Sequence, residues 1–178
     1  MSLLEKSYPA AQFRFCPFCG TSGFREKKVF CHVCSSCGRS FYTNSAAAVV
    51  AIITDKDSRV LVTVRKNNPA KGTLDLPGGF VTPGESVENA LIREIKEELN
   101  LDIVSMEYFG SFPNRYLYDK LVYFTTDMVF ICKAGDLSKL NAGDDVDSCR
   151  FMYVSDISEE EIGLFSIREI IKLYSGTK

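Results

Sequence analysis

The chain has 178 residues, 46% of them hydrophobic and 25% charged, and a formal net charge of −2, a composition that excludes disordered and collagen-like proteins. The longest apolar run, residues 46–53, is far shorter than the roughly 18 residues of a membrane-spanning helix. Residues 1–10 have no apolar stretch behind a basic start and do not resemble a secretory signal, so we expect a cytoplasmic protein without a membrane partner.

Charge and cysteines divide the chain into two parts. Residues 1–43 contain six Lys/Arg and two acidic residues, whereas residues 44–178 contain 15 Lys/Arg and 21 acidic residues, which gives net charges of +4 and −6. Five of the seven cysteines also lie in the first part. The second part is long enough to bury one core, but a domain of 43 residues usually needs a metal ion or another cross-link. We therefore predict a small domain over 1–43 and a larger one over 44–178.

Two C-x2-C pairs, separated by 14 residues, dominate the first part. Their members are Cys16, Cys19, Cys34 and Cys37. This spacing is typical of a zinc ribbon, in which four thiolates bind Zn²⁺; the alternatives are a redox-active dithiol or buried reduced thiols. A glycine follows each pair, as a tight turn with positive φ favours, whereas Cys31-His32-Val33-Cys34 lacks one. We predict the four cysteines as zinc ligands and leave Cys31 and His32 out.

The basic excess of the first part has two interpretations. Four thiolates around Zn²⁺ carry a formal charge of −2, which nearby Lys and Arg side chains would offset. Alternatively, the cations bind nucleic acid while phenylalanines stack on its bases. These phenylalanines are Phe13, Phe15, Phe18, Phe24 and Phe30. Because a charge of +4 is only mildly basic and phenylalanines in a small domain usually form its core, the sequence favours a ribbon without a nucleic-acid partner.

The larger part begins with β-rich runs. Residues 49–54 and 60–65 flank a turn-like tetrapeptide, which predicts a β-hairpin. A loop with proline and glycine over 67–73 then precedes a short strand over 74–76. We predict further strands over 103–110, 121–131 and 151–154, and helices over 86–100 and 162–174. Strands alternating with helices indicate an α/β sandwich with a mixed sheet.

The helix over 86–100 carries a cluster of carboxylates. At about 100° per residue, Glu94, Glu97 and Glu98 fall within an arc of roughly 100°, beside an apolar arc that can pack on a sheet. Carboxylates at i and i+4 repel each other, and hard cations such as Mg²⁺ prefer carboxylate and carbonyl oxygens. The alternative is a solvated stripe balanced by Arg93 and other basic neighbours.

The spacing of the whole segment resembles the Nudix box. The matching positions are Gly79, Glu85, Arg93, Glu94, Ile95, Glu97, Glu98 and Leu101. Asn100 stands where the family has glycine, and asparagine is the next best residue for a left-handed helix end. The chain thus resembles a Nudix hydrolase over about residues 44–178, preceded by a zinc ribbon. The resemblance implies a Nudix-type α/β/α sandwich.

The family hydrolyses nucleoside diphosphates linked to another moiety, with Mg²⁺ or Mn²⁺ and attack by water. The resemblance implies that Glu97 and Glu98 bind the Mg²⁺ together with the carbonyl of Gly78. It makes Glu94 a further ligand or the base that activates water. Such a cation neutralises pyrophosphate oxygens and lowers the pKa of bound water, so an acidic site can act on an anionic substrate.

Two further groups follow from the same resemblance. Arg93 would orient the carboxylates, and Glu85 would brace Arg93. Family members differ over an additional carboxylate on a loop after the box, for which this chain offers Asp144, Asp145 and Asp147. A solvated acidic loop explains any one of these three equally well.

A four-cysteine ribbon before a Nudix domain is similar to the arrangement of NADH pyrophosphatases. Those enzymes carry a second signature, S-Q-P-W-P-F-P-x-S, of which residues 110–116 share only a Phe-Pro core, and the chain has no tryptophan. We therefore expect NAD(H), ADP-ribose or another ADP-linked compound as substrate. Candidate substrate contacts are Arg65, Lys71, Phe112, Arg115, Tyr116 and Tyr118. The alternatives are surface charges for the cations and core positions for the aromatic rings.

One functional alternative from another class stays open. In it, the Nudix domain senses a nucleotide and the ribbon contacts DNA or RNA, so that the chain acts as a nucleic-acid-binding regulator. The complete glutamate cluster favours the hydrolase, because a sensor has no need of it. The resemblance also implies a homodimer.

Overall fold

The computed structural model describes residues 7–143 and 145–177. Asp144 and most of the segment compared with a secretory signal therefore lie outside the described residues. The chain forms two compact units: Met1–Ser45 with Arg115–Phe124, and Ala46–Asn114 with Thr125–Lys178. We call them the ribbon unit and the larger unit. None of the helices in the described ranges is both long and apolar enough to cross a membrane.

The ribbon unit is built on a small antiparallel sheet in the order β1-β2-β3. Its elements are the 3₁₀ helix η2 (Pro9–Gln12) and the strands β1 (Phe24–Lys28), β2 (Cys31–Cys34) and β3 (Ser40–Tyr42). Phe24 and Phe41 form its core together with two cysteines. By contrast, Phe13, Phe15 and Phe18 are exposed, so the expectation that the phenylalanines form the core is wrong for these three.

A segment from the middle of the chain completes the ribbon unit. The backbone N–H of Val122 donates to the carbonyl of Ser7 at 2.9 Å, and the Phe124 ring lies 5.1 Å from Phe30 and 6.3 Å from Tyr8. These edge-on and tilted aromatic contacts are favourable arrangements of ring quadrupoles. The ribbon unit therefore includes a hairpin tip that lies about 80 residues downstream of β2 in the sequence.

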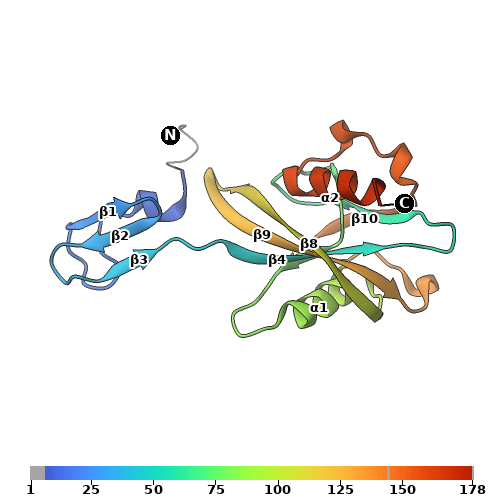
Figure 1. Cartoon of the computed structure of the whole chain (residues 1–178), viewed down its shortest axis with the longest axis horizontal. Helices are drawn as coiled ribbons and strands as arrows, with labels where there is room; N and C mark the ends of the chain where they lie inside the picture. The colour runs from blue at the N-terminus through green and yellow to red at the C-terminus, as the bar shows by residue number, and fades with distance from the viewer. Residues whose placement is uncertain (1–6, 144, 178) are drawn as a thin grey trace. The chain divides into compact units, whose positions relative to one another are not determined.

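The larger unit contains two sheets and two α-helices (Figure 1). Its strands are β4 (Ala46–Ile53), β5 (Val60–Arg65), β6 (Leu74–Asp75), β7 (Gly78–Phe80), β8 (Ile103–Tyr118), β9 (Leu121–Ala134) and β10 (Val146–Met152). Its α-helices are α1 (Val87–Leu99) and α2 (Phe165–Ser175). One sheet has the order β7-β4-β9-β8 and is mixed, with β4 parallel to β9 and antiparallel to β7. The other, β10-β5-β6, is antiparallel.

Strand β4 lies between two apolar cores. Because side chains alternate along a strand, Val49, Ala51 and Ile53 pack in the core that includes α1, while Val50 and Ile52 pack in the core that includes α2. Figure 1 shows the two helices on opposite sides of the strands. The predicted α/β/α sandwich with a mixed sheet is confirmed.

The predicted hairpin between residues 49–54 and 60–65 is wrong. β4 and β5 belong to different sheets and share only the bridge Thr54–Val60. Both edges of β4 are already occupied, by β7 and β9, so no edge is left for β5. The turn itself does form, since the backbone N–H of Asp55 donates to the carbonyl of Arg59 at 3.0 Å.

Several predicted elements have different bounds. β8 continues to Tyr118, where Asp119 and Lys120 both have positive φ, as a two-residue hairpin turn requires. β10 lies earlier than the predicted 151–154, and α2 starts at Phe165 rather than at residue 162. The acidic residues before it form a separate 3₁₀ helix, η5 (Glu159–Glu161). A further pair of 3₁₀ helices, η3 (Leu137–Lys139) and η4 (Val154–Asp156), flanks β10.

Both predicted ends of α1 are confirmed. The hydroxyl of Ser86 accepts a hydrogen bond from the Asn89 N–H at 3.2 Å, which caps the helix. Asn100 ends it with φ 54°, in the left-handed region. These caps fix where the helix begins and ends, and hence which way its glutamates point.

Candidate active site and metal centre

Two glycines let β7 lie against both β4 and α1. A Cβ on Gly78, whose φ is 148°, would overlap the carbonyl oxygen of Val49. A Cβ on Gly79 would overlap the carboxylate of Glu94. The backbone thus approaches the glutamates more closely than any other residue type would allow. This close approach is the physical reason for the Gly-Gly pair before the helix.

Arg93 connects the loop before α1, the end of β7 and two glutamates. Its guanidinium donates to both carboxylate oxygens of Glu85 at 3.0 and 2.9 Å, to Glu94 at 2.8 Å, to Glu97 at 3.0 Å and to the Phe80 carbonyl at 3.1 Å. The hydrogen bonds that Arg93 donates to Glu85, followed by the one that it donates to Glu94, raise the pKa of Arg93 above its ordinary value. Arg93 is therefore held in one orientation by contacts on several sides.

Glu98 is buried, with only 8% of its surface exposed. Burial raises its pKa to about 8; the hydrogen bond from the Gly78 N–H at 3.0 Å lowers it, and the nearby Glu94, Asp75 and Asp145 raise it further. Within the described ranges, no Lys or Arg forms an ion pair with Glu98. A buried carboxylate without a cationic partner suits a site for a divalent cation.

The three glutamates differ in exposure and in their hydrogen-bond partners. The Glu94 side chain is only 15% exposed, and Glu97 at 49% is the most accessible. Glu94 and Glu97 bind Arg93, whereas Glu98 accepts from the N–H of Gly78. Of the residues that the structure describes, only the four cysteines converge as a compact group of metal-ligating side chains. The contact of Gly78 uses its N–H, so its predicted carbonyl role stays a prediction.

A buried ion pair that the sequence did not reveal lies beside Glu98. Arg65 donates to Asp75 at 2.5 Å and to the carbonyl of Pro69 at 2.7 Å, and the Arg65 side chain is 18% exposed. Burial raises the pKa of Asp75, although Arg65 lowers it. Arg65, predicted as a substrate contact, is thus placed against protein groups. The feature of the sequence that could have revealed this ion pair is Asp75 itself, a carboxylate between two leucines of a short apolar strand.

The loop before β10 covers the end of α1. Gly143 donates its N–H to the carbonyl of Glu98 at 2.8 Å, and Asn141 donates to that of Leu99 at 3.1 Å, which satisfies two carbonyls of the last turn. Of the predicted loop carboxylates, Asp145 accepts from the Asn67 amide at 2.7 Å and lies close enough to raise the pKa of Glu98. Asp147 is exposed.

The predicted aromatic and basic substrate contacts come from different parts of the structure. Phe112 is half-buried and packs against the core that includes α2, whereas Arg115 and Tyr116 belong to the ribbon unit, as does Tyr118. Lys71 is exposed on the loop before β6. Sequence reasoning also missed a buried polar pair on β9. There the Thr125 hydroxyl donates to Asp127 at 2.7 Å.

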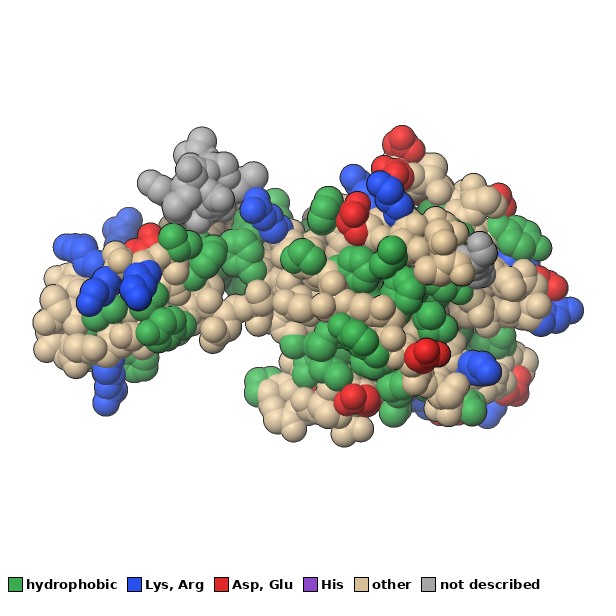
Figure 2. All heavy atoms as spheres, in the orientation of Figure 1, with side chains coloured by type: hydrophobic (Ala, Val, Ile, Leu, Met, Phe, Trp, Pro, Cys, Tyr) green, Lys and Arg blue, Asp and Glu red, His purple; other side chains and the backbone are tan. Residues whose placement is uncertain are grey.

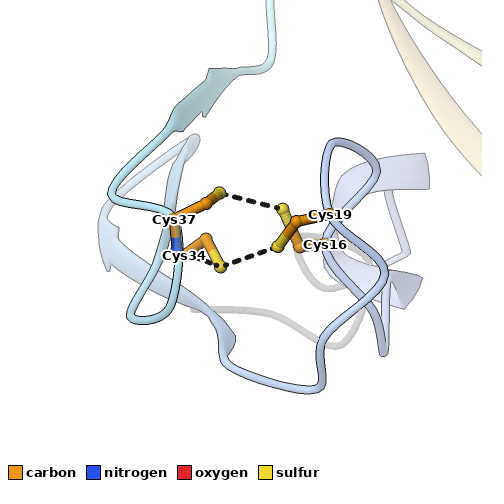
Figure 3. Close-up of side chains that lie close together, drawn as sticks. All are labelled: Cys16, Cys19, Cys34 and Cys37. Carbon is orange, nitrogen blue, oxygen red and sulfur yellow. Dashed lines mark hydrogen bonds between the residues drawn. The ribbon is translucent and has the colours of Figure 1, made fainter.

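The four predicted cysteines of the ribbon unit do converge (Figure 3). All four sulfurs lie within 4.8 Å of one another, with 3.8 Å between Cys16 and Cys37 and 3.7 Å between Cys19 and Cys34. A tetrahedral zinc site with Zn–S bonds of about 2.3 Å has sulfurs about 3.8 Å apart. The cluster is therefore consistent with a zinc ribbon. Cys31 is not part of it.

Each C-x2-C pair forms the expected turn. Gly20 and Gly38 have φ of 74° and 71°, and their N–H groups donate to the carbonyls of Cys16 and Cys34 at 2.9 and 3.0 Å. Within the turns, backbone N–H groups point at sulfur, as from Phe18 to Cys16 at 3.4 Å. Such N–H groups stabilise negative charge on the sulfurs.

The protonation of the sulfurs also fits a bound cation. The Thr21 hydroxyl, helped by the backbone N–H of Cys37, lowers the pKa of Cys34 to about 5. At Cys37 the backbone N–H of Arg39 lowers the pKa, but burial and the other sulfurs outweigh it and raise the pKa to about 11. Four thiolates this close together are thus stable only when a cation offsets their charge.

Comparison with known proteins assigns the larger unit. The family model described as NUDIX domain matches residues 44–174. An ADP-ribose pyrophosphatase of Methanocaldococcus jannaschii is 38% identical over 77% of this chain and 77% of its own length. The NAD-capped RNA hydrolase NudC of Edwardsiella ictaluri is 30% identical over 70% of this chain, but the match spans only 46% of that longer protein.

The crystal structure of a NUDIX hydrolase from Nitrosomonas europaea shares the fold, with a TM-score of 0.69 over 93% of this chain and 92% of its own, at 24% identity. The chain belongs to the NUDIX family.

Proposed function

We propose that this chain is a pyrophosphatase that uses Mg²⁺ or Mn²⁺ to cleave an ADP-linked compound by attack of water. The observation that carries the proposal is the buried carboxylate of Glu98, which has no cationic partner among residues 7–143 and 145–177 and lies beside Glu94 at the Gly-Gly turn. A relative of 38% identity is named for ADP-ribose. This likeness and the incomplete second signature at 110–116 support our proposal that ADP-ribose is preferred to NAD(H).

Glu94, Glu97 and Glu98 would hold the divalent cation. When bound, the cation neutralises pyrophosphate oxygens and makes bound water more acidic. The protein's own contribution is orientation. Because Glu85 binds Arg93 through both carboxylate oxygens, the guanidinium is fixed and keeps Glu94 and Glu97 on one side of α1, within one helical turn of Glu98.

The test is hydrolysis by the whole chain of ADP-ribose, NADH, FAD, diadenosine polyphosphates and nucleoside triphosphates with Mg²⁺, followed as released AMP or phosphate. We expect ADP-ribose to be cleaved best. Glu97→Gln should lower kcat more than about a hundredfold, because loss of a ligand costs more than loss of an outer-sphere contact. Glu88→Gln, on the first turn of the same helix, should leave kcat unchanged. If none of these compounds is hydrolysed, the proposal that the chain is a pyrophosphatase is wrong.

We also propose that the ribbon cluster binds one Zn²⁺ through Cys16, Cys19, Cys34 and Cys37, in a structural role. The sulfur separations support four-thiolate coordination, and four protein ligands leave no open position for substrate or water.

The homodimer implied by the family resemblance stays a prediction. Sedimentation equilibrium of the full chain would test it, with a mass near twice 19.9 kDa as the expected result.

A further inference from the structure

Aromatic side chains lie on the surface of the ribbon unit. Phe15 is 62% exposed and precedes the first C-x2-C turn, and Phe18 is 45% exposed and lies within that turn. The guanidinium of Arg39, from the second turn, lies 5.4 Å from the centre of the Phe18 ring. Rings left in water lose the free energy that burial would give them, so they do not serve the packing of the ribbon, whose core is Phe24 and Phe41.

Basic side chains accompany these rings. In residues 7–45 the basic side chains are Arg14, Arg25, Lys27, Lys28 and Arg39. None of them forms an ion pair within the described part of the chain. The one acidic residue of this stretch, Glu26, instead accepts from the Tyr8 hydroxyl at 2.8 Å and the Phe30 N–H at 3.2 Å. Figure 2 shows Lys and Arg side chains spread over the ribbon among hydrophobic ones.

Contrary to the expectation from the sequence, we infer that the ribbon unit binds single-stranded nucleic acid. Bases would stack on Phe15 and Phe18, and the basic side chains of residues 7–45 would hold the phosphates. Stacking platforms beside cations are how proteins bind single strands without reading their sequence, since every base has a π-face. The Arg39–Phe18 pair adds a guanidinium plane on which a base can stack. The inference concerns the ribbon unit alone and does not depend on the proposed hydrolase.

Single strands fit these features better than the other anionic partners. A duplex hides its base faces, so it would use the cations and leave Phe15 and Phe18 unused. An acidic peptide would likewise use charge alone. A single strand should therefore need Phe15 and Phe18 for binding, whereas another polyanion should not.

The test is fluorescence anisotropy of the full, zinc-loaded chain with a fluorescein-labelled oligouridine of about 12 nucleotides at low salt. We expect binding to be weakened about tenfold for each ring removed in Phe15→Ala and Phe18→Ala. Phe165→Ala is the matched control, because this phenylalanine of the larger unit is 60% exposed and should not affect binding. An oligothymidine of the same length distinguishes RNA from DNA as the preferred source of this chemistry.

The cations are tested through salt. In the double variant Lys27→Gln/Lys28→Gln, the slope of log K against log salt should fall by about 1.4, the value for two lost phosphate contacts on a single strand. Lys56→Gln, an exposed lysine of the β4–β5 turn, is the control. All variants should keep their zinc and their rate of ADP-ribose hydrolysis. The inference is overturned if the chain does not bind oligouridine, binds duplex RNA equally well, or binds as tightly without both rings.

Discussion

Three basic side chains of the larger unit differ in their partners from the basic side chains of residues 7–45. In the larger unit Arg65, Arg93 and Lys96 each hold a carboxylate within ion-pair distance, so their charge fixes acidic groups near α1. In the ribbon unit the cations of residues 7–45 have no such partners among the residues described. A cation that forms an ion pair within the protein holds a carboxylate in place, whereas a cation without such a partner remains available to a ligand.

The two units also differ in what holds them together. The larger unit buries two apolar cores on either side of β4, whereas the ribbon unit has only a small cluster of Phe24, Phe41 and two cysteines and an aromatic group around Tyr8. So little apolar surface stabilises a fold weakly. The ribbon should therefore depend on its metal and the larger unit on packing, and three changes test that contrast.

The largest expected effect is the loss of the ribbon on removal of zinc. Structural zinc contributes on the order of 10 kcal/mol to folding, so a chelator or Cys16→Ser should unfold β1 to β3. Hydrogen exchange should show fast exchange of these amides while those of α1 stay protected. Cys31→Ser, a buried cysteine outside the cluster, should keep its zinc. Protected ribbon amides in the chelated chain would contradict the proposed structural role.

A smaller effect is expected from a cavity in the larger unit. Ile95 is fully buried on α1 and packs in the core with Val49 and Leu61. Ile95→Ala should lower the free energy of unfolding by about 3 kcal/mol, measured by urea denaturation. Ile92→Ala, on the same helix but 42% exposed, is the control and should cost less than about 1 kcal/mol. Zinc should stay bound in both, and its release on Ile95→Ala would show that the units do not fold independently.

Sequence reasoning succeeded where the determining interactions are local. Ser86 and Asn100 fix the ends of α1 through contacts within one turn, and the cysteine spacing within each pair fixes the turns at Gly20 and Gly38. Both are set by short-range geometry, which a one-dimensional pattern encodes. The same holds for the helix positions of the glutamates.

The features that the sequence did not predict depend on contacts between segments that are distant in the chain. The Arg65–Asp75 pair, the hairpin tip in the ribbon unit and the separation of β4 from β5 each follow from how strands assemble. Helical periodicity places Glu98 on the stripe with Glu94, but only the approach of Gly78 and the loop at Gly143 decides that it is buried. No local pattern specifies such burial.

The smallest effect concerns Glu98 and gives a pH dependence. Its pKa is raised from 4.5 to about 8 in the folded, metal-free chain, so the unfolded state releases its proton at lower pH. The neutral form therefore stabilises the fold fully below pH 4.5, and this contribution is lost as pH rises through about 8.

Glu98→Gln keeps an oxygen for the Gly78 N–H but has no charge to bury. In chelated protein we expect the variant to be more stable than the parent at pH 9, by about 3 kcal/mol or less, and equal to it at pH 4. Thermal denaturation at both pH values measures this. The variant should also lose activity, because the carboxylate that lowers the stability of the larger unit is the one that the proposed reaction needs. Equal stability of variant and parent at pH 9 would show that Glu98 is not held in a buried, uncompensated state.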